Sequence, residues 1–238
     1  MNKNININIC HSIIIDYPIN YNNFPLAKNE EIFKVELNKN DFLTIPEGWF
    51  HWVYTDPNTV SISYQIPYID FKDFDNPFYN SFKFSNPYKG TKIIDINYND
   101  FINSTQNDYY FSVISETNDC SPVVKNDKLK FVYENTLSNI IENYKNNYMY
   151  IGNNKLKTES IVFKYKKINT LIDEKFYNNV MYKTSVWFSF DKTINSGLHF
   201  DDTNNIIFVL DGRKTVYLLN PKSKPNLYVK DMFEINDL

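Results

Sequence analysis

The sequence predicts a mainly β domain, either a β-sandwich or an open barrel, with a few helices. Short runs in which apolar and polar residues alternate recur along the chain, and turn-forming residues separate them. Only one segment has the one-sided apolar stripe of a clear amphipathic helix. With 238 residues, of which 42% are hydrophobic and 17% aromatic, residues 1–238 can form one domain around a substantial core.

The N-terminal part contains three expected strands. Phe33 to Leu37 alternates apolar with charged residues, and a second strand, Phe42 to Ile45, follows after a turn. The third runs from Val60 to Ile66, with Ser61, Ser63 and Gln65 on its polar face. We expect it to form an antiparallel pair with the segment before it, across the turn at residues 56–58.

The remaining elements are a connection, four strands and a helix. Residues 69–90 contain Pro77, Pro87 and Gly90 and are expected to be an irregular connection. Residues 136–146 are expected to form the helix, because their apolar residues recur at helical spacing. The strands are expected at 109–114, 185–190, 206–210 and 214–219, the last two forming a hairpin across the turn Asp211-Gly212.

Composition excludes several classes of protein. The net charge of −3 and the pI near 5.7 leave no global basic field for nucleic acid. Cys10 and Cys120 indicate free thiols of a reducing compartment, and Cys10-His11 is interpreted as packing rather than as a metal site. The alternating N-terminus is neither a signal peptide nor a membrane span. We therefore expect a soluble intracellular protein, cytoplasmic or nuclear, without a membrane partner.

The rare residues of this chain gather in two stretches, 45–53 and 186–214. These hold all three tryptophans, two of the three histidines and three of the five glycines. On a strand, His199 and Asp201 would face the same side and could bind one ion together. His51 is the candidate third ligand, and two imidazoles with one carboxylate form the facial triad of non-haem iron oxygenases. A surface His-x-Asp without metal, and a core histidine at His51, are the alternative interpretations.

Two sets of motifs carry a family resemblance. The first comprises Ser196-Gly197-Leu198-His199-Phe200-Asp201, Asn204-Asn205-Ile206-Ile207 and Gly212-Arg213-Lys214. The second comprises Asn40-Asp41-Phe42-Leu43, Ile45-Pro46-Glu47-Gly48-Trp49-Phe50-His51-Trp52-Val53 and Val60-Ser61-Ile62-Ser63-Tyr64. Together they resemble the JmjC-like (cupin-8) branch of the Fe(II)- and 2-oxoglutarate-dependent oxygenases. The resemblance implies a double-stranded β-helix, a cupin or jelly-roll fold, with iron held by His51, His199 and Asp201.

The order of the two motif sets differs from that of the family. There the distal histidine follows His-x-Asp, whereas His51 precedes it by almost 150 residues. Either the domain is circularly permuted, or two chains exchange halves to complete each site. We favour permutation within one chain, because cuts in exposed loops are tolerated. The expected parts are a distal-histidine half (20–68), the connection (69–90), flanking strands and helix (91–185), and a half with His-x-Asp and lysine (186–222).

The resemblance also implies the residues that bind 2-oxoglutarate. Lys214 is expected to pair with the far carboxylate, whose burial without a cation would be costly. Strand alternation puts Lys214, Val216 and Leu218 on one face, although Arg213-Lys214 could instead be a solvated pair at a turn. The further residues implied to contact the co-substrate are Asn205, Ser196, Gln65 and Tyr150, with Tyr148 as the alternative tyrosine.

The sequence thus predicts an Fe(II)- and 2-oxoglutarate-dependent oxygenase that hydroxylates a protein side chain or another macromolecular substrate. A protein or peptide is the expected partner, RNA is the second option, and a homodimer is compatible with the family. The alternative is a catalytically degenerate metal-binding cupin that serves as an interaction module. A metal-dependent lyase or isomerase cupin is disfavoured, because such sites usually need more histidines than this chain's three.

Overall fold

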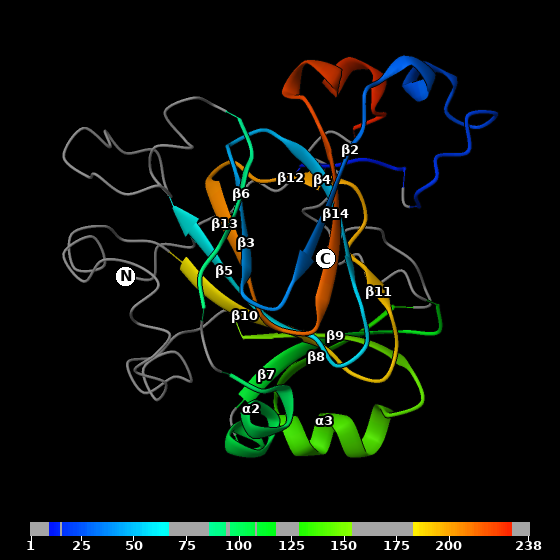
Figure 1. The fold of residues 1–238 in the computed structure, drawn as a ribbon. Helices are drawn as coiled ribbons and strands as arrows, with labels where there is room; N and C mark the ends of the chain where they lie inside the picture. Colours follow the sequence, from blue (N-terminus) through cyan, green and yellow to red (C-terminus); the bar gives the residue numbers. More distant parts are fainter. Residues whose placement is uncertain are drawn as a thin grey trace, which may run out of the picture.

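Two antiparallel sheets packed face to face form the framework of the protein (Figure 1). The computed structural model describes residues 10–14, 16–66, 86–93, 96–107, 109–117, 129–153 and 183–229. The first sheet is ordered β1 (Cys10–His11), β12 (His199–Phe200), β4 (Phe50–Thr55), β14 (Arg213–Leu219) and β2 (Phe33–Asn38), with β11 (Ile194–Asn195) beside β4. This architecture confirms the predicted mainly β, jelly-roll fold.

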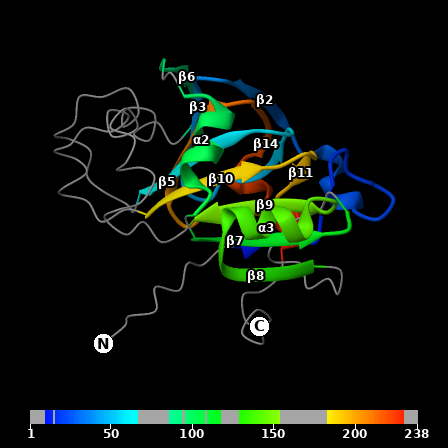
Figure 2. The same ribbon diagram turned by 90° about the horizontal axis from the view of Figure 1, so that it is seen from below.

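The second sheet has eight strands and supports the helices. Its order is β6 (Tyr88–Thr91), β3 (Asp41–Ile45), β13 (Asn204–Asp211), β5 (Val60–Ile66), β10 (Lys183–Ser189), β9 (Tyr148–Asn153), β7 (Tyr109–Ser115) and β8 (Leu129–Thr136). Figure 2 shows α3 (Leu137–Tyr144) against the β7–β9 end of this sheet. This helix confirms the one predicted at 136–146. Its N-terminus is capped by the Thr136 hydroxyl, which accepts a hydrogen bond from the Asn139 N–H.

A second α-helix and two shorter 3-10 helices complete the described structure. α2 (Tyr98–Thr105) begins at Asn97, whose side chain accepts from the N–H groups of Asn99 and Asp100. Two 3-10 helices, η1 (Pro25–Asn29) and η3 (Pro221–Asn226), contact each other at the end of the molecule away from α2 and α3 (Figure 1). Within the described ranges, no helix has both the length and the apolar character needed to cross a bilayer.

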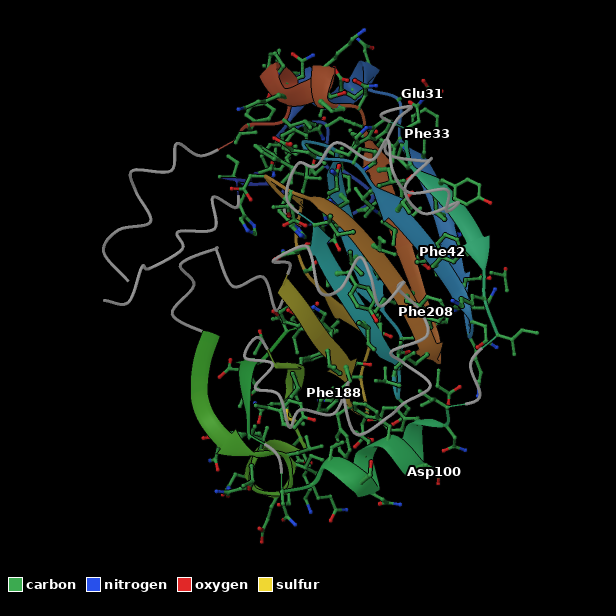
Figure 3. All side chains as sticks on the ribbon, turned by 90° about the vertical axis from the view of Figure 1, so that its left-hand side faces the viewer. Glu31, Phe33, Phe42, Asp100, Phe188 and Phe208 are labelled. Atoms are coloured by element: carbon green, nitrogen blue, oxygen red, sulfur yellow. The ribbon has the colours of Figure 1, made fainter. Side chains whose placement is uncertain are left out.

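The apolar core divides into layers on both sides of the sheets. The layer between the eight-stranded sheet and the helices includes Ile62, Phe188, Phe101, Leu137 and Ile140. Figure 3 shows Phe42 and Phe208 on adjacent strands, with Phe188 nearer to α2. The layer between the two sheets includes Leu43, Val53, Ile207, Val209 and Val216. A third cluster, under η1 and η3, includes Ile14, Phe50, Trp52, Leu219 and Leu227.

Strand alternation then decides what faces the space between the sheets. On β5, Ile62 and Tyr64 belong to the layer under the helices, so Ser63 and Gln65 face the other sheet. On β4, Phe50 and Trp52 pack outward, so His51 and Val53 point inward. The interior of the sandwich is therefore apolar in one part and polar in another. The polar part holds the candidate site.

The predicted pairing of strands that are consecutive in sequence is wrong in two places. β4 and β5 were expected to pair, but β4 pairs with β12 and β14 while β5 pairs with β13 and β10. The expected hairpin of β13 and β14 is likewise absent, because these strands lie in different sheets. At both turns the chain crosses from one sheet to the other, so consecutive strands lie in different layers of the sandwich.

The two crossing turns are fastened to each other. Thr59, after β4, accepts a hydrogen bond from the Arg213 N–H at 3.0 Å and donates to the Arg213 carbonyl at 3.2 Å. Gly212, before β14, has φ of +84°, a backbone conformation that favours glycine. The turn residues that predicted hairpins therefore serve crossings between sheets.

The connection predicted at 69–90 is partly wrong. Residues 67–85 lie outside the described residues, but Tyr88 to Gly90 form part of β6, which pairs with β3. Gly90 suits this strand because a Cβ there would meet the Phe42 ring at 2.3 Å. The predicted faces of β14 are confirmed, since Lys214, Val216 and Leu218 are buried and Arg213 is exposed.

Candidate metal and co-substrate site

The three histidines of the chain form one row across three neighbouring strands. His11 on β1 is the cross-strand partner of His199 on β12, and His199 is the partner of His51 on β4. Cross-strand partners present their side chains on the same face of a sheet. The three imidazoles therefore lie side by side on the inner face of the first sheet.

His51, His199 and Asp201 converge closely enough to hold one metal ion. One ligand atom from each lies within 4.8 Å of the other two, and the His51 Nε2 is 3.9 Å from the Asp201 Oδ2. The His51 and His199 rings are 4.2 Å apart between centroids, inclined at 55°. Asp201 follows β12 directly rather than lying within it, yet its carboxylate still reaches the histidines. A single chain supplies all three groups, so this geometry needs no exchange of halves between chains.

Each of the two candidate ligand histidines is oriented by a hydrogen bond of the same kind, from its Nδ1 to the backbone carbonyl two residues earlier. The His51 Nδ1 lies 3.0 Å from the Trp49 carbonyl, and the His199 Nδ1 lies 3.0 Å from the Gly197 carbonyl. A carbonyl only accepts, so each Nδ1 carries the proton and donates it. Each Nε2 is thereby left with a free lone pair, as a metal ligand requires.

Asp201 is held by hydrogen bonds from β13, the next strand in the sequence, and from Gly48. The Asn205 side-chain amide donates to the Asp201 Oδ2 at 2.9 Å, and the Gly48 N–H donates to the Asp201 carbonyl at 3.1 Å. Asp201 is buried, as are Asn205 and His51. Such support for a ligating carboxylate fixes the direction in which its oxygens point.

Burial keeps the imidazole of His51 neutral. The pKa of His51 falls from 6.5 to about 4, first because the ring is buried and second because His199 is close. Asp201 and the hydrogen bond to Trp49 oppose this shift in part. A neutral imidazole is the form that binds metal, so His51 is ready for a ligand role at neutral pH.

A cavity of about 110 Å³ extends from these groups between the two sheets. One water needs roughly 10–15 Å³ of such space, so the cavity can accept a small molecule. The residues that line it are His11, His51, Val53, Ser63, Gln65, Tyr150, Ser185, Trp187, Ser196, His199, Asp201, Asn205, Ile207 and Lys214. Every site residue predicted from the sequence is among them, although the role of each stays a prediction.

Lys214 is the buried cation of this cavity. Its side chain is only 2% exposed, and burial lowers its pKa from 10.5 to about 7. Among the described residues, no carboxylate lies within ion-pair distance, and the Nζ is 6.0 Å from the centre of the Tyr150 ring. Lys214 lies opposite Thr55, four residues along β4 from His51, which is roughly 13 Å of strand. This is a spacing between backbone positions, and the side chains of Lys214 and the triad, which line the same cavity, fill part of it, so a small diacid could bridge the gap that is left.

The other predicted co-substrate residues differ in how they are held. Ser196 accepts a hydrogen bond from the Val53 N–H at 3.2 Å, which fastens it to β4. Tyr150 stacks on Trp187 with parallel rings 4.8 Å apart, whereas Tyr148 lies under the Lys192 ammonium outside the cavity lining. The structure thus brings Tyr150, rather than Tyr148, to the cavity.

Sequence reasoning missed His11 as a member of this site. It had been interpreted as packing, but its ring stacks on His199 at 5.1 Å and lines the cavity. Burial and the nearby His199 and His51 lower the pKa of His11 to about 2, so it is neutral. The available signal was that His11 is one of only three histidines, but its pairing with β12 is a long-range contact that sequence spacing does not reveal.

Comparison with known proteins agrees with this architecture. The sequence profile of the cupin-like domain family matches residues 79–237, which include His199, Asp201 and Lys214. His51 precedes the matched region. No solved structure was found to match the chain.

Two relatives are named for a JmjC domain. One, from Acanthamoeba polyphaga mimivirus, is 26% identical over 242 residues, which cover 88% of this chain and 37% of the relative. The other, JmjC domain-containing protein C of Dictyostelium discoideum, is 38% identical over 55 residues, or 23% of this chain and 13% of the relative. The chain thus spans little more than a third of the length of the mimivirus relative. On the profile match, which covers more than half of its residues, the chain belongs to the cupin-like domain family.

Proposed function

We propose that this chain is an Fe(II)- and 2-oxoglutarate-dependent oxygenase that hydroxylates a protein side chain or another macromolecular substrate. One observation carries the proposal: a buried His-His-Asp triad and a buried lysine without a carboxylate partner among the described residues line the same cavity. The triad suits a divalent ion with open coordination positions, and the lysine suits a carboxylate.

The donor set fits Fe(II). His51 and His199 offer Nε2 lone pairs, Asp201 offers a carboxylate oxygen, and three protein ligands on one side leave room for a chelating ligand and oxygen. Iron with 2-oxoglutarate and oxygen supplies the oxidation, in which one oxygen atom enters the substrate C–H bond and the other enters succinate as carbon dioxide leaves.

The cavity fits 2-oxoglutarate. The ammonium of Lys214 can pair with the carboxylate farthest from the metal, and the Asn205 Oδ1 is buried without a hydrogen-bond partner. Such groups are costly when unsatisfied and are stabilised by a polar ligand. Val53, Ile207 and Trp187 form apolar parts of the wall, which limit the access of water to the reacting atoms.

The test measures succinate formed from labelled 2-oxoglutarate by the iron-loaded protein in air. The wild-type protein is expected to form succinate slowly even without a target substrate. Asp201→Ala should abolish both iron binding and succinate formation. Asp202→Ala is the matched control, because it removes the neighbouring carboxylate, which does not line the cavity.

A degenerate cupin is the competing function, and the same assay separates it. Iron bound at one equivalent per chain, with no succinate above the Asp201→Ala background in the presence of candidate peptides, would reject the oxygenase. Candidate substrates can be sought by incubating the iron-loaded protein with peptide libraries and detecting a mass increase of one oxygen atom.

A further inference from the structure

His11 is a third imidazole in the site that the triad does not use. It is 3% exposed, it lines the cavity, and it stacks on the ligand candidate His199 with 15° between the ring planes. Both of its ring nitrogens are buried without a hydrogen-bond partner. His11 is therefore a polar group aimed at the cavity with nothing in the described structure to satisfy it.

The geometry argues against His11 as a fourth metal ligand. Histidine lone pairs lie in the ring plane, so two nearly parallel rings 5.1 Å apart direct them alongside each other rather than at one point. The group of atoms that could share an ion comprises His51, His199 and Asp201 without His11. His11 also lacks the bond from Nδ1 to a backbone carbonyl that orients both ligand histidines.

A buried imidazole without a hydrogen-bond partner destabilises the folded protein. Leaving a buried donor or acceptor unpaired costs about 1–3 kcal/mol, so such groups in folded proteins usually have a partner in a water or a ligand. A neutral imidazole has one donor and one acceptor nitrogen. It can therefore donate one hydrogen bond to an oxygen atom of a ligand at the neighbouring metal position.

The position of His11 indicates which part of a ligand it meets. In the first sheet, β1 and β12 lie on one side of β4, and β14 with Lys214 lies on the other. A diacid whose far carboxylate pairs with Lys214 would put its opposite end at the triad, toward β12 and β1. That end of a 2-oxo acid carries the carboxylate and keto oxygens that chelate a metal.

We propose that His11 donates a hydrogen bond to the metal-chelating carboxylate of a bound 2-oxo acid and so completes the co-substrate site. This inference rests on the proposed function, since it takes His51, His199 and Asp201 as the metal ligands and Lys214 as the partner of the far carboxylate. His11 and Lys214 would then hold the two ends of one diacid.

The test uses calorimetric titration of the full chain loaded with Mn(II), which avoids turnover. The two ligands are 2-oxoglutarate, which has both ends, and oxalate, which has only a chelating end. His11→Phe preserves a flat ring against His199 but removes both nitrogens. The variant should lower the affinity for both ligands roughly 10- to 100-fold, which is the effect expected for the loss of a hydrogen bond to a charged group.

Two further variants separate this role from a structural one. His11→Gln restores a donor and should recover part of the affinity for both ligands. Lys214→Met should lower the affinity for 2-oxoglutarate and leave the affinity for oxalate unchanged. Mn(II) affinity, followed by electron paramagnetic resonance, should stay close to wild type in His11→Phe, and the melting temperature without a 2-oxo acid should not fall.

The outcomes that overturn the inference are distinct from those that overturn the proposed function. Two results would show that His11 does not contact the chelating end. One is an unchanged affinity for both ligands in His11→Phe, and the other is a loss of Mn(II) binding without a separate loss of oxalate affinity. Wild-type protein that binds oxalate but not 2-oxoglutarate would reject the oxygenase proposal, while the oxalate comparison still tests His11. Wild-type protein that binds neither ligand would reject both.

Discussion

Under the proposed function, Lys214 should make the affinity for 2-oxoglutarate depend on pH in a definite direction. Burial lowers its pKa from 10.5 to about 7. A carboxylate binds the charged ammonium, so only the protonated fraction of the protein is competent. Below pH 7 most of the protein is competent, and above it the fraction falls tenfold for each pH unit. The apparent Kd should therefore rise about 100-fold between pH 6 and pH 9.

The same shift sets the energy scale. Lowering the pKa from 10.5 to about 7 corresponds to about 5 kcal/mol of free energy against the charged form in the folded protein. Because the unfolded chain keeps this proton up to pH 10.5, Lys214 makes the free energy of unfolding rise with pH between about 7 and 10.5. Lys214→Met removes this buried charge, so it should raise the melting temperature at pH 6 while it lowers the affinity for 2-oxoglutarate.

The assay is calorimetric titration of the Mn(II)-loaded protein with 2-oxoglutarate from pH 6 to pH 9. Lys214→Met should lose affinity at pH 6 and show a flat profile above it. Arg213→Met is the matched control, because Arg213 is an exposed cation on the opposite face of β14, paired with Asp56 at 2.6 Å. A wild-type affinity that stays constant to pH 9, or an Arg213→Met profile as flat as that of Lys214→Met, would refute this reasoning.

Three further predictions concern the metal and the framework. His51→Ala should reduce Fe(II) or Mn(II) binding at least tenfold in equilibrium dialysis, and retention of wild-type affinity would remove His51 from the ligand set. Gly212→Ala should lower stability by more than about 1 kcal/mol in urea unfolding, because the added Cβ would lie 2.7 Å from the Thr59 Cα. Gly48→Ala shares the positive φ but meets nothing within 3.7 Å, so its cost should be smaller, and equal losses would contradict the steric argument. Phe188→Ala should cost about 3–5 kcal/mol, since this ring is fully buried beneath α2, and a loss under 1 kcal/mol would contradict that packing.

Local sequence patterns predicted seven of the strands and one helix, because those patterns are local, but they did not predict α2 or β8. The strand at Val60 to Ile66 follows from its alternation, and the helix near 137–144 follows from its apolar spacing. The turns were also located correctly, but their consequence was not. A turn fixes where the chain reverses, whereas pairing or crossing to the other sheet depends on contacts with distant strands.

The alternation of residues did not show which face of a strand packs against the helices and which faces the other sheet. Ile62 and Tyr64 would conventionally face the inside of a sandwich, yet they pack under the helices while Ser63 and Gln65 face the space between the sheets. The reason is that helices cover the outer face of this sheet, so both of its faces are buried. The polar face then becomes the wall of the cavity.

The sequence by itself determined the composition of the site: two scarce histidines, an aspartate and a lysine in motifs that resemble one family. Only the tertiary structure decided that these groups meet within one chain, and that His11 joins them. His11, His199 and His51 become neighbours through the register of β1, β12 and β4, and such register is fixed by the packing of whole strands. Residues almost 190 positions apart in the chain meet because hydrogen-bonded strands lie only about 4.8 Å apart, whatever their distance in sequence.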